Sequence, residues 1–335
     1  MKILVTGATS MIGRHVIDLL KVRGDDITVM QRRNCGIEGV NEVCFDIAQT
    51  VDPKADTDHT LQHALSGCDA VIHLAAKVNI AGRWEDFEAI NVLGAERLAM
   101  TAKQCGVKRF VHISTPSVAH AGKSLVGESA GVAGPSQVRG HYARSKALGE
   151  QRMLAANSDE MKVVALRPHL VWGPGDTQLV QRIIERARAG RLVLVGSGLA
   201  LIDTTYVDNA ASAIVAALDN IEQAAGHALV ISNGQPRTVS EIMQRILRCA
   251  GLPTTLRTVP ASVAIAAGTA IEHVWEAMNK QGDTPMTRFL AEQLATAHWF
   301  DQRTTQRLLD WSPSVTLEEG FQRLAAAQSS PKGIA

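Results

Sequence analysis

The chain has 335 residues, of which 46% are hydrophobic and 20% are charged, a composition typical of globular proteins. The formal net charge is +1, so no excess of either sign exists to bind nucleic acid or a membrane surface through bulk electrostatics. The five cysteines are scattered and include no C-x-x-C pair, a pattern that suits neither a disulfide framework nor a zinc site.

The first residues read MKILVTGA, which is typical of a strand and not of the charged and then apolar run of a signal peptide. No run of roughly 18 consecutive apolar residues follows, the length that a membrane-spanning helix needs. We therefore expect a cytoplasmic protein without an integral membrane segment, with its cysteines reduced.

Apolar, β-rich runs alternate with segments of helical periodicity through the first two-thirds of the chain. Strands that are almost continuously Val, Ile and Leu predict a parallel sheet covered on both faces. Right-handed crossovers then give an α/β fold with a doubly wound parallel sheet, the Rossmann arrangement. We expect strands at 2–6, 27–30, 43–45, 70–74, 109–114 and 163–167, and helices at 12–22, 84–105 and 142–156.

The pattern changes after Pro168. Gly173-Pro174-Gly175 and Gly196-Ser197-Gly198 interrupt the chain and indicate loops between shorter elements. Thr238-Val239-Ser240-Glu241 is a capping-box pattern that predicts a helix to about residue 249. The expected division is a Rossmann core over 1–168, a smaller C-terminal substrate lobe over 169–328 whose strands and helices partly return to the core, and a tail at 329–335.

Residues 2–13 read K-I-L-V-T-G-A-T-S-M-I-G, which predicts a strand, a tight turn and the start of a helix. Gly7 gives the turn its backbone freedom, and Gly13 lets the helix lie close to the strand. Free N–H groups at such a helix N-terminus bind a pyrophosphate. Ser10 replaces a usual glycine; its side chain would either crowd the diphosphate or donate to a phosphate oxygen, and we favour the second. The turn residues expected to contact a dinucleotide are Gly7, Thr9, Ser10, Met11, Ile12 and Gly13.

Gln31-Arg32-Arg33 follow the expected second strand. An NAD site has a carboxylate here for the ribose 2′-hydroxyl, whereas a 2′-phosphate requires arginines. Because Gln31 replaces the acid and two arginines come next, the sequence favours NADP(H), with NAD(H) as the alternative; the non-binding interpretation is two solvated surface arginines. Asp46 follows the third strand, and we expect it, with Ile47, to meet the adenine.

Tyr142-Ala143-Arg144-Ser145-Lys146 is a Y-x-x-x-K sequence at the start of a predicted helix. One helical turn places Tyr142 and Lys146 on the same face. A phenol with a pKa of about 10 is a poor acid–base catalyst at neutral pH, and a neighbouring ammonium would stabilise its phenolate. Thr115 ends the preceding strand, where its hydroxyl can bond a substrate oxygen. The three residues predict a Thr–Tyr–Lys catalytic group; the alternative is an interface tyrosine and a surface lysine.

With these motifs the chain resembles the extended short-chain dehydrogenases/reductases over almost its whole length. His73-Leu74-Ala75-Ala76, Asn91-Val92-Leu93-Gly94 and Ser114-Thr115 are similar to motifs of that family. A closer resemblance is to its 3β-hydroxysteroid dehydrogenase-like branch, near the bacterial 2-alkyl-3-oxoalkanoate reductases of olefin biosynthesis and the sterol-4-carboxylate 3-dehydrogenases. The segments that carry this resemblance are 167–176 (RPHLVWGPGD), 204–209 (TTYVDN) and 287–290 (TRFL).

The resemblance implies a role for each matching residue. Tyr142 would be the general acid toward a ketone or the base toward an alcohol, and Lys146 would hold the nicotinamide ribose and lower the tyrosine pKa. Thr115 would orient the carbonyl oxygen, with Ser117 as a weaker substitute. Pro116 directly after Thr115 departs from the pattern beside the site. Backbone contacts to the cofactor are implied for Leu74, Ala75, Ala76 and Pro168.

The Ala-rich stretch 260–278 is either an apolar pocket or lid, or the core of the lobe. As a pocket it would suit an acyl-chain or terpenoid ketone, and a 3-oxo acid would also need a cation for its carboxylate. His169 would donate to the substrate or pack as a core histidine. The apolar candidates are Trp275, Met278, Met286, Trp299 and Phe300, and the cationic ones are Lys77, Arg83, Arg139 and Arg144.

The leading hypothesis is thus an NADP(H)-dependent oxidoreductase that interconverts a ketone and a secondary alcohol on a small hydrophobic substrate. An NAD-dependent nucleotide-sugar epimerase or dehydratase shares the same motifs, and a non-catalytic NADP(H)-sensing protein is the third hypothesis. The family resemblance also implies a homodimer, formed through the helices near 84–105 and 142–156.

Overall fold

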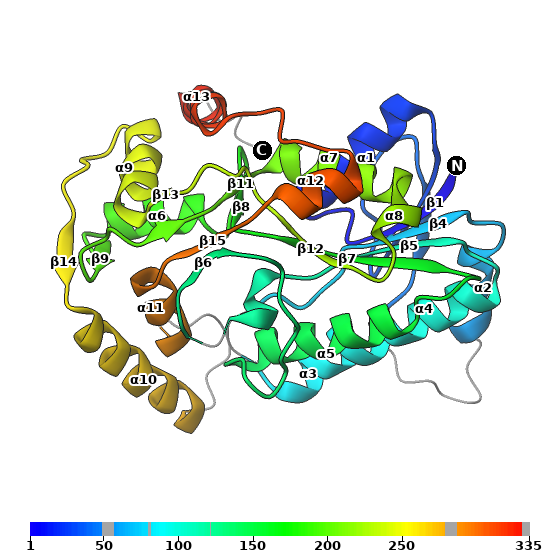
Figure 1. Ribbon diagram of the computed structural model, residues 1–335, viewed down its shortest axis with the longest axis horizontal. Helices are drawn as coiled ribbons and strands as arrows, with labels where there is room; N and C mark the ends of the chain where they lie inside the picture. The colour runs from blue at the N-terminus through cyan, green and yellow to red at the C-terminus, as the bar shows by residue number, and fades with distance from the viewer. Residues whose placement is uncertain (49–56, 80–81, 121, 279–286, 330–335) are drawn as a thin grey trace.

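A seven-stranded parallel sheet organises the chain, with strand order β12-β7-β5-β4-β1-β2-β3 (Figure 1). The computed structural model describes residues 1–48, 57–79, 82–120, 122–278 and 287–329. The sheet confirms the doubly wound fold. Six of its strands differ from the predicted ranges only at their ends, and the seventh, β12, was not predicted. Its strands are β1 (Lys2–Thr6), β2 (Asp26–Gln31), β3 (Asn41–Cys44), β4 (Ala70–His73), β5 (Arg109–Ile113), β7 (Lys162–Pro168) and β12 (Ala228–Ile231).

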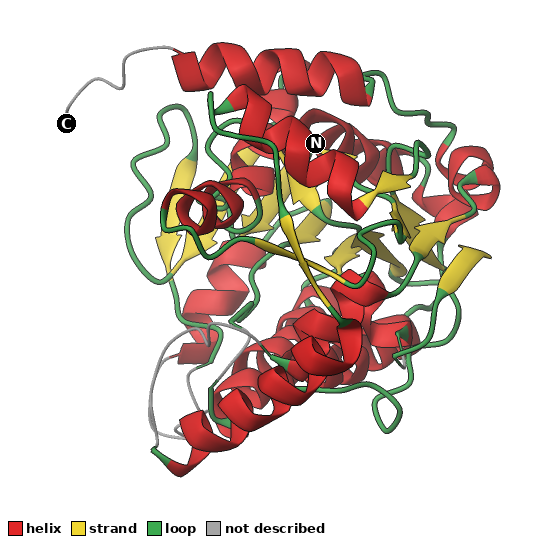
Figure 2. Ribbon diagram, turned by 90° about the vertical axis from the view of Figure 1, so that its left-hand side faces the viewer, coloured by secondary structure: helices red, strands yellow, loops and turns green. Residues whose placement is uncertain are grey.

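Helices cover both faces of the sheet, because its apolar strands are buried on both sides (Figures 1 and 2). One core cluster joins Val5 of β1 to Leu20 of α1 and Ile214 of α7. The other joins Leu4 of β1 to Leu98 of α4 and Met153 of α5. The first face carries α1 (Met11–Arg23), α7 (Val207–Asp219), α8 (Ile221–Ala224) and α12 (Arg303–Leu309), and the second α2 (Thr57–Leu65), α4 (Ala95–Gln104) and α5 (His141–Ala155).

The helix expected over 84–105 is not uniform. It consists of α3 (Trp84–Glu88), a π-helical turn η1 (Ala89–Gly94) and α4 in direct succession. Asn91 explains the irregular turn: its amide bonds both main-chain polar groups of Lys77 and the hydroxyl of Ser145. A π turn is a common feature of functional sites, and this one lies against α5.

A third hydrophobic cluster gathers buried residues from the part of the chain after Pro168, among them Trp172, Ile184, Ile246 and Phe321. The helix predicted from the capping-box pattern is present, and the Thr238 hydroxyl accepts from Glu241 N at 3.1 Å. The Glu241 carboxylate contacts Arg245 at 3.1 Å. The chain also forms a four-stranded sheet in the order β13-β10-β15-β6 and two pairs of strands. The remaining elements are η2 (Pro116–Ala119), β6 (Leu125–Glu128), β8 (Val171–Trp172), α6 (Val180–Arg188), β9 (Val193–Val195), β10 (Leu201–Ile202), β11 (Thr205–Tyr206), β13 (Arg237–Thr238), α9 (Val239–Cys249), β14 (Arg257–Val259), α10 (Ala261–Ala277), α11 (Arg288–Ala295), β15 (His298–Phe300) and α13 (Leu317–Ser329).

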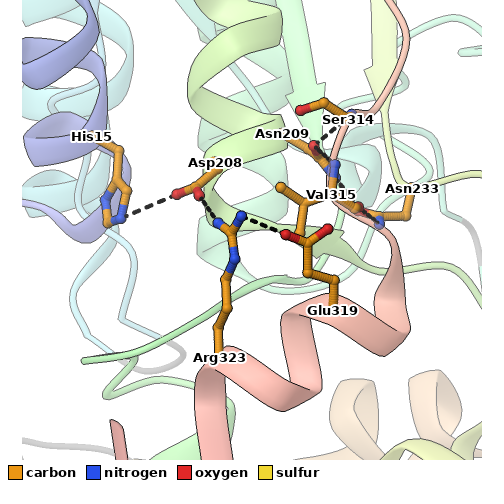
Figure 3. Close-up of polar contacts among 8 residues, drawn as sticks. All are labelled: His15, Asp208, Asn209, Asn233, Ser314, Val315, Glu319 and Arg323. Atoms are coloured by element: carbon orange, nitrogen blue, oxygen red, sulfur yellow. Dashed lines mark hydrogen bonds and ion pairs between the residues drawn. The ribbon is translucent and has the colours of Figure 1, made fainter. Parts of the chain in front are cut away.

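Polar contacts attach the last segment of the chain to α7 (Figure 3). Asn209 is fully buried; its Oδ1 accepts from the main-chain N of Ser314 and of Val315, each at 3.0 Å. Its Nδ2 donates to Val315 O at 2.7 Å. Beside it, Asp208 pairs with Arg323 of α13 at 2.6 Å. Asn209 is therefore the buried centre of this attachment, and the ion pair is its exposed rim.

Replacing Asn209 with alanine is expected to lower the free energy of unfolding by about 3 kcal/mol, because several buried main-chain groups lose their partners. Chemical denaturation measures the change. Asn34→Ala, at an exposed asparagine that bonds only Gly36 N in the described chain, is the matched control and should cost less than about 1 kcal/mol. Equal effects of the two substitutions would contradict this account.

Candidate active site

The turn between β1 and α1 is closely packed on all sides. Gly7 has a φ of +71°, and a Cβ on it would lie 2.7 Å from Ala75 N, at the end of β4. A Cβ on Gly13 would lie 2.4 Å from Gly7 O. Only glycine fits either position, so the N-terminus of α1 is held against the ends of two strands. The partial positive charge of this helix N-terminus suits a dinucleotide diphosphate.

Ser10 caps α1. Its hydroxyl donates to Gly7 O at 2.8 Å and accepts from Gly13 N at 3.0 Å, the two bonds of an N-cap serine within this turn. The side chain is exposed at the surface of the turn. Its expected contact with a phosphate oxygen stays a prediction.

The end of β2 carries the residues expected to select the cofactor. The Gln31 Oε1 accepts from the Thr9 hydroxyl at 2.9 Å, and its Nε2 is buried with no partner among the described residues. Arg32 and Arg33 are exposed, and none of the ion pairs among the described residues includes either of them. This edge therefore offers an unused amide donor and two cations to a ribose or its phosphate.

The other residues predicted to contact the cofactor lie on neighbouring loops. Asp46 accepts from Ala48 N at 2.9 Å, and Ile47 O is 2.7 Å from where a Cβ on Gly94 would lie. Ala75 N donates to the Thr6 hydroxyl at 3.1 Å, so that main-chain group is already bonded. Leu74, Ala76 and Pro168 are partly buried, Leu74 and Ala76 just after β4 and Pro168 at the end of β7.

The structure brings Thr115 and Tyr142 together. A hydrogen bond from the Thr115 side chain lowers the pKa of Tyr142, but burial has the larger effect and raises it. Thr115 also caps η2, its hydroxyl accepting from Ser117 N at 3.3 Å. Pro116 is the first residue of that turn and is buried, a position where its missing N–H costs nothing. The departure at Pro116 is thus accommodated without displacing Thr115.

Lys146 lies one turn beyond Tyr142 and is 3% exposed. Its Nζ donates to Ile113 O, at the end of β5, at 2.5 Å. Desolvation lowers the pKa of Lys146 to about 8, against the opposing effect of Glu150. The expectation that Lys146 lowers the pKa of Tyr142 is not met in this conformation, because the ammonium points to Ile113 O. The phenol accordingly keeps its proton at neutral pH.

Two buried histidines lie beneath this site. The His73 Nδ1 bonds the Thr6 hydroxyl at 2.7 Å, and the rings of His73 and His112 are 5.5 Å apart. Neither ring nitrogen of His112 has a partner among the described residues. Burial and the Lys146 charge lower the pKa of both, that of His73 to about 3. The neutral rings therefore add no positive charge beside the ammonium.

The sequence analysis did not assign a role to Asn91. The motif around Asn91 can be recognised in the sequence. Its bonds to Lys77 and Ser145 cannot, because these residues are 14 and 54 positions away. The Ser145 hydroxyl in turn donates to Tyr142 O at 2.9 Å. Asn91 thus supports the first turn of α5, which carries the tyrosine.

On the substrate side the predicted residues do not form one group. Trp299 and Phe300 line a cavity of about 390 Å³ beside Asp203 and Gln302. Met278 is 57% exposed, and Met286 lies outside the described residues. His169 is buried, with its Nε2 3.1 Å from His298 Nδ1. A larger cavity, about 460 Å³, lies by Arg167 and Glu150 at the edge strand β12, away from Thr115.

The candidate cations differ in their partners. Lys77 pairs with Asp86 at 3.2 Å, and Arg83, which is 71% exposed, with Glu85 at 3.5 Å. The Arg144 guanidinium lies over the Trp84 ring at 4.5 Å. Arg139 pairs with Glu292 of α11 at 3.0 Å. Among these, Arg139 alone connects the loop before Tyr142 to the C-terminal lobe.

Comparison with known proteins agrees with the fold and shows the family. Residues 3–232 match the model of the NAD dependent epimerase/dehydratase family. The chain is 38% identical to a 2-alkyl-3-oxoalkanoate reductase of Stenotrophomonas maltophilia (strain K279a), over 98% of this chain and all of that protein. It is 31% identical to a sterol-4-alpha-carboxylate 3-dehydrogenase, decarboxylating, of Schizosaccharomyces pombe, over 78% of each. The structure of MoeE5 in complex with UDP-glucose and NAD shares the fold, with a TM-score of 0.72, 23% identity and 98% of each chain covered.

The buried histidines predict how stability depends on pH. Burial lowers the folded-state pKa of His298 to about 4, below an unfolded value of about 6.5. Its contribution to stability is complete above pH 6.5 and is lost as the pH falls toward 4. Over that window this residue should contribute a slope of about 1.4 kcal/mol per pH unit to the free energy of unfolding.

His298→Gln should reduce the acid slope by that amount, as measured by urea denaturation at several pH values. His227→Gln, at an exposed position, is the control and should leave the slope unchanged. An identical slope in wild type and His298→Gln would show that His298 does not titrate in this way.

Proposed function

The chain belongs to the NAD dependent epimerase/dehydratase family, and we propose that it is an NADP(H)-dependent reductase of 2-alkyl-3-oxoalkanoates. It is an oxidoreductase of the extended short-chain dehydrogenase/reductase type. The observation that carries the proposal is the grouping of three residues at the carboxyl edge of the sheet: Thr115 just past β5 lowers the pKa of the Tyr142 phenol, and Lys146, one turn further along α5, bonds Ile113 O at the end of β5. The 38% identity to a reductase of this name, over nearly the whole of both chains, supports the substrate class. The product would be the 3-hydroxy acid.

The proposed mechanism uses the proton that Tyr142 retains. A nicotinamide dinucleotide, when bound, supplies hydride to the carbonyl carbon. The Thr115 hydroxyl orients the carbonyl oxygen, and the Tyr142 phenol donates its proton to that oxygen. Because burial raises the pKa of Tyr142, the phenol is protonated at neutral pH, which favours the reductive direction. Lys146 would hold the ribose hydroxyls and stabilise the phenolate that results.

The preference for NADP(H) is supported by the residues after β2. Arg32 and Arg33 are exposed, and the ion pairs of the described residues include neither. Residue 31 is a glutamine, whereas NAD sites have an acidic residue at this point that bonds the ribose 2′-hydroxyl. Two guanidiniums there are suited to a 2′-phosphate.

A homodimer is supported by the outer surface of the helices that cover the second face of the sheet. Leu93 and Met100 are 50% and 58% exposed and lie seven residues apart, so they share one face of the η1–α4 helix. Exposed apolar side chains in such a row are typical of protein interfaces.

Among the described residues no helix is both long and apolar enough to cross a bilayer. Our proposal places the enzyme in the cytoplasm.

Tyr142→Phe should lower kcat by at least a thousandfold, since the proton donor is lost, while the dissociation constant for NADPH changes less than threefold. Consumption of NADPH with a 2-alkyl-3-oxoalkanoate and fluorescence titration give the two values. Tyr206→Phe, at the other tyrosine of the chain, is the control and should retain turnover. Turnover by Tyr142→Phe at the wild-type rate would refute the proposal.

Replacing Arg32 and Arg33 with alanine should weaken NADPH binding at least tenfold, because two charge-assisted bonds to the 2′-phosphate are lost. NADH binding should change little, so the ratio of the two dissociation constants is the quantity to measure. Arg303→Ala, at an 89% exposed side chain, is the control. An unchanged ratio in the double variant would show that these arginines do not select the cofactor.

A further inference from the structure

Two arginines and one carboxylate join α11 to the loop before Tyr142. Arg139 Nη1 lies 3.0 Å from Glu292 Oε1, and Arg288 Nε lies 2.9 Å from the same oxygen. Arg139 stands three residues before Tyr142, and Arg288 is the first residue of α11. The cluster therefore lies at the start of the helix that carries the proposed proton donor.

Helix α11 also contacts the loop that carries Thr115. His120 follows η2, five residues after Thr115, and its ring meets that of Phe289 edge-on at 6.5 Å. A Cβ on Gly122 would lie 3.2 Å from Glu292 Oε2. Glu292 thus lies between the loop that follows Thr115 and the loop that precedes Tyr142.

The two guanidiniums have donors to spare. The side chains of Arg139 and Arg288 are 44% and 42% exposed, whereas that of Glu292 is 10% exposed. An arginine has five N–H donors, and each guanidinium here gives one of them to Glu292, the one carboxylate that either contacts in the described chain. Glu292 is the least exposed of the three side chains, and each arginine keeps donors that Glu292 does not use.

Unpartnered polar atoms lie in the same place. Glu292 Oε2 and His120 Nε2 are both buried without a hydrogen-bond partner among the described residues. His120 Nδ1 accepts from Gly122 N at 3.3 Å, so in the neutral ring Nε2 carries the proton. Buried polar groups are almost always satisfied by protein, water or ligand. His120 Nε2–H is therefore a buried donor suited to a carboxylate oxygen, whereas Glu292 Oε2 is an acceptor suited to a water or another donor.

We propose that Arg139 and Arg288 bind the carboxylate of the substrate, with Glu292 as the residue that positions them. The identity of the ligand, a 2-alkyl-3-oxoalkanoate, rests on the proposed function. A guanidinium binds a carboxylate through paired N–H···O bonds, and a 3-oxo acid places its carboxylate two carbons from the carbonyl that Thr115 and Tyr142 would bind. The arginines thereby distinguish 3-oxo acids from neutral ketones.

The test is calorimetric binding of a 2-alkyl-3-hydroxyalkanoate and of its methyl ester to the NADP⁺-loaded protein. Arg139→Gln and Arg288→Gln should each weaken binding of the acid about tenfold or more and leave binding of the ester unchanged. Arg191→Gln, at an exposed arginine distant in sequence from both loops, should change neither. Equal losses for acid and ester, or no loss for either, would overturn the proposal.

The melting temperature shows whether each arginine variant folds. If one variant does not fold, the binding data of the other variant test the proposal. The binding measurement also does not depend on turnover. If the wild type reduces no 3-oxo acid but the acid-specific loss is seen, the proposed function fails and the carboxylate site stands. If the wild type reduces the 3-oxo acid but the arginine variants bind the acid and the ester equally weakly, the proposed function stands and the carboxylate site fails.

Discussion

A buried ammonium at the carboxyl edge of the sheet is the interaction on which the proposed site depends. Lys146 gives up its hydration, and the bond from Nζ to Ile113 O only partly offsets that cost, as the lowered pKa of Lys146, about 8, indicates. The bond ties α5 to the end of β5. The same two elements carry Tyr142 and, just past β5, Thr115, so one contact fixes the relative position of all three side chains.

The dinucleotide turn shows a second constraint, which is space. Gly7 and Gly13 leave no room for a Cβ, so α1 begins against the strand ends. Ser10 does not disturb this packing because its hydroxyl satisfies Gly7 O and Gly13 N within the turn. The serine that departs from the family pattern thus stabilises the turn. The main-chain N–H groups at this helix end would bind the diphosphate under our proposal.

The local parts of this arrangement were predictable from the sequence, and the long-range parts were not. Alternating strand and helix patterns gave the sheet, and the four-residue spacing placed Tyr142 and Lys146 on one face. The direction of the Lys146 ammonium depends on Ile113, 33 residues away, and no periodicity reports such a contact. The bonds of Asn91 to Lys77 and Ser145, which accompany the π turn, are also long-range contacts. So is the ion pair between Glu292 and Arg139, which distinguishes Arg139 from the other three candidate cations.

The most direct measurement is transfer of deuterium from NADPH labelled at C4 of the nicotinamide to a 2-alkyl-3-oxoalkanoate, followed by mass spectrometry of the product. If Thr115, Tyr142 and Lys146 act as described, the wild type yields a 3-hydroxy acid with deuterium on C3. A protein that binds labelled NADPH yet leaves the 3-oxo acid unreduced, or returns a product without label at C3, would contradict the account.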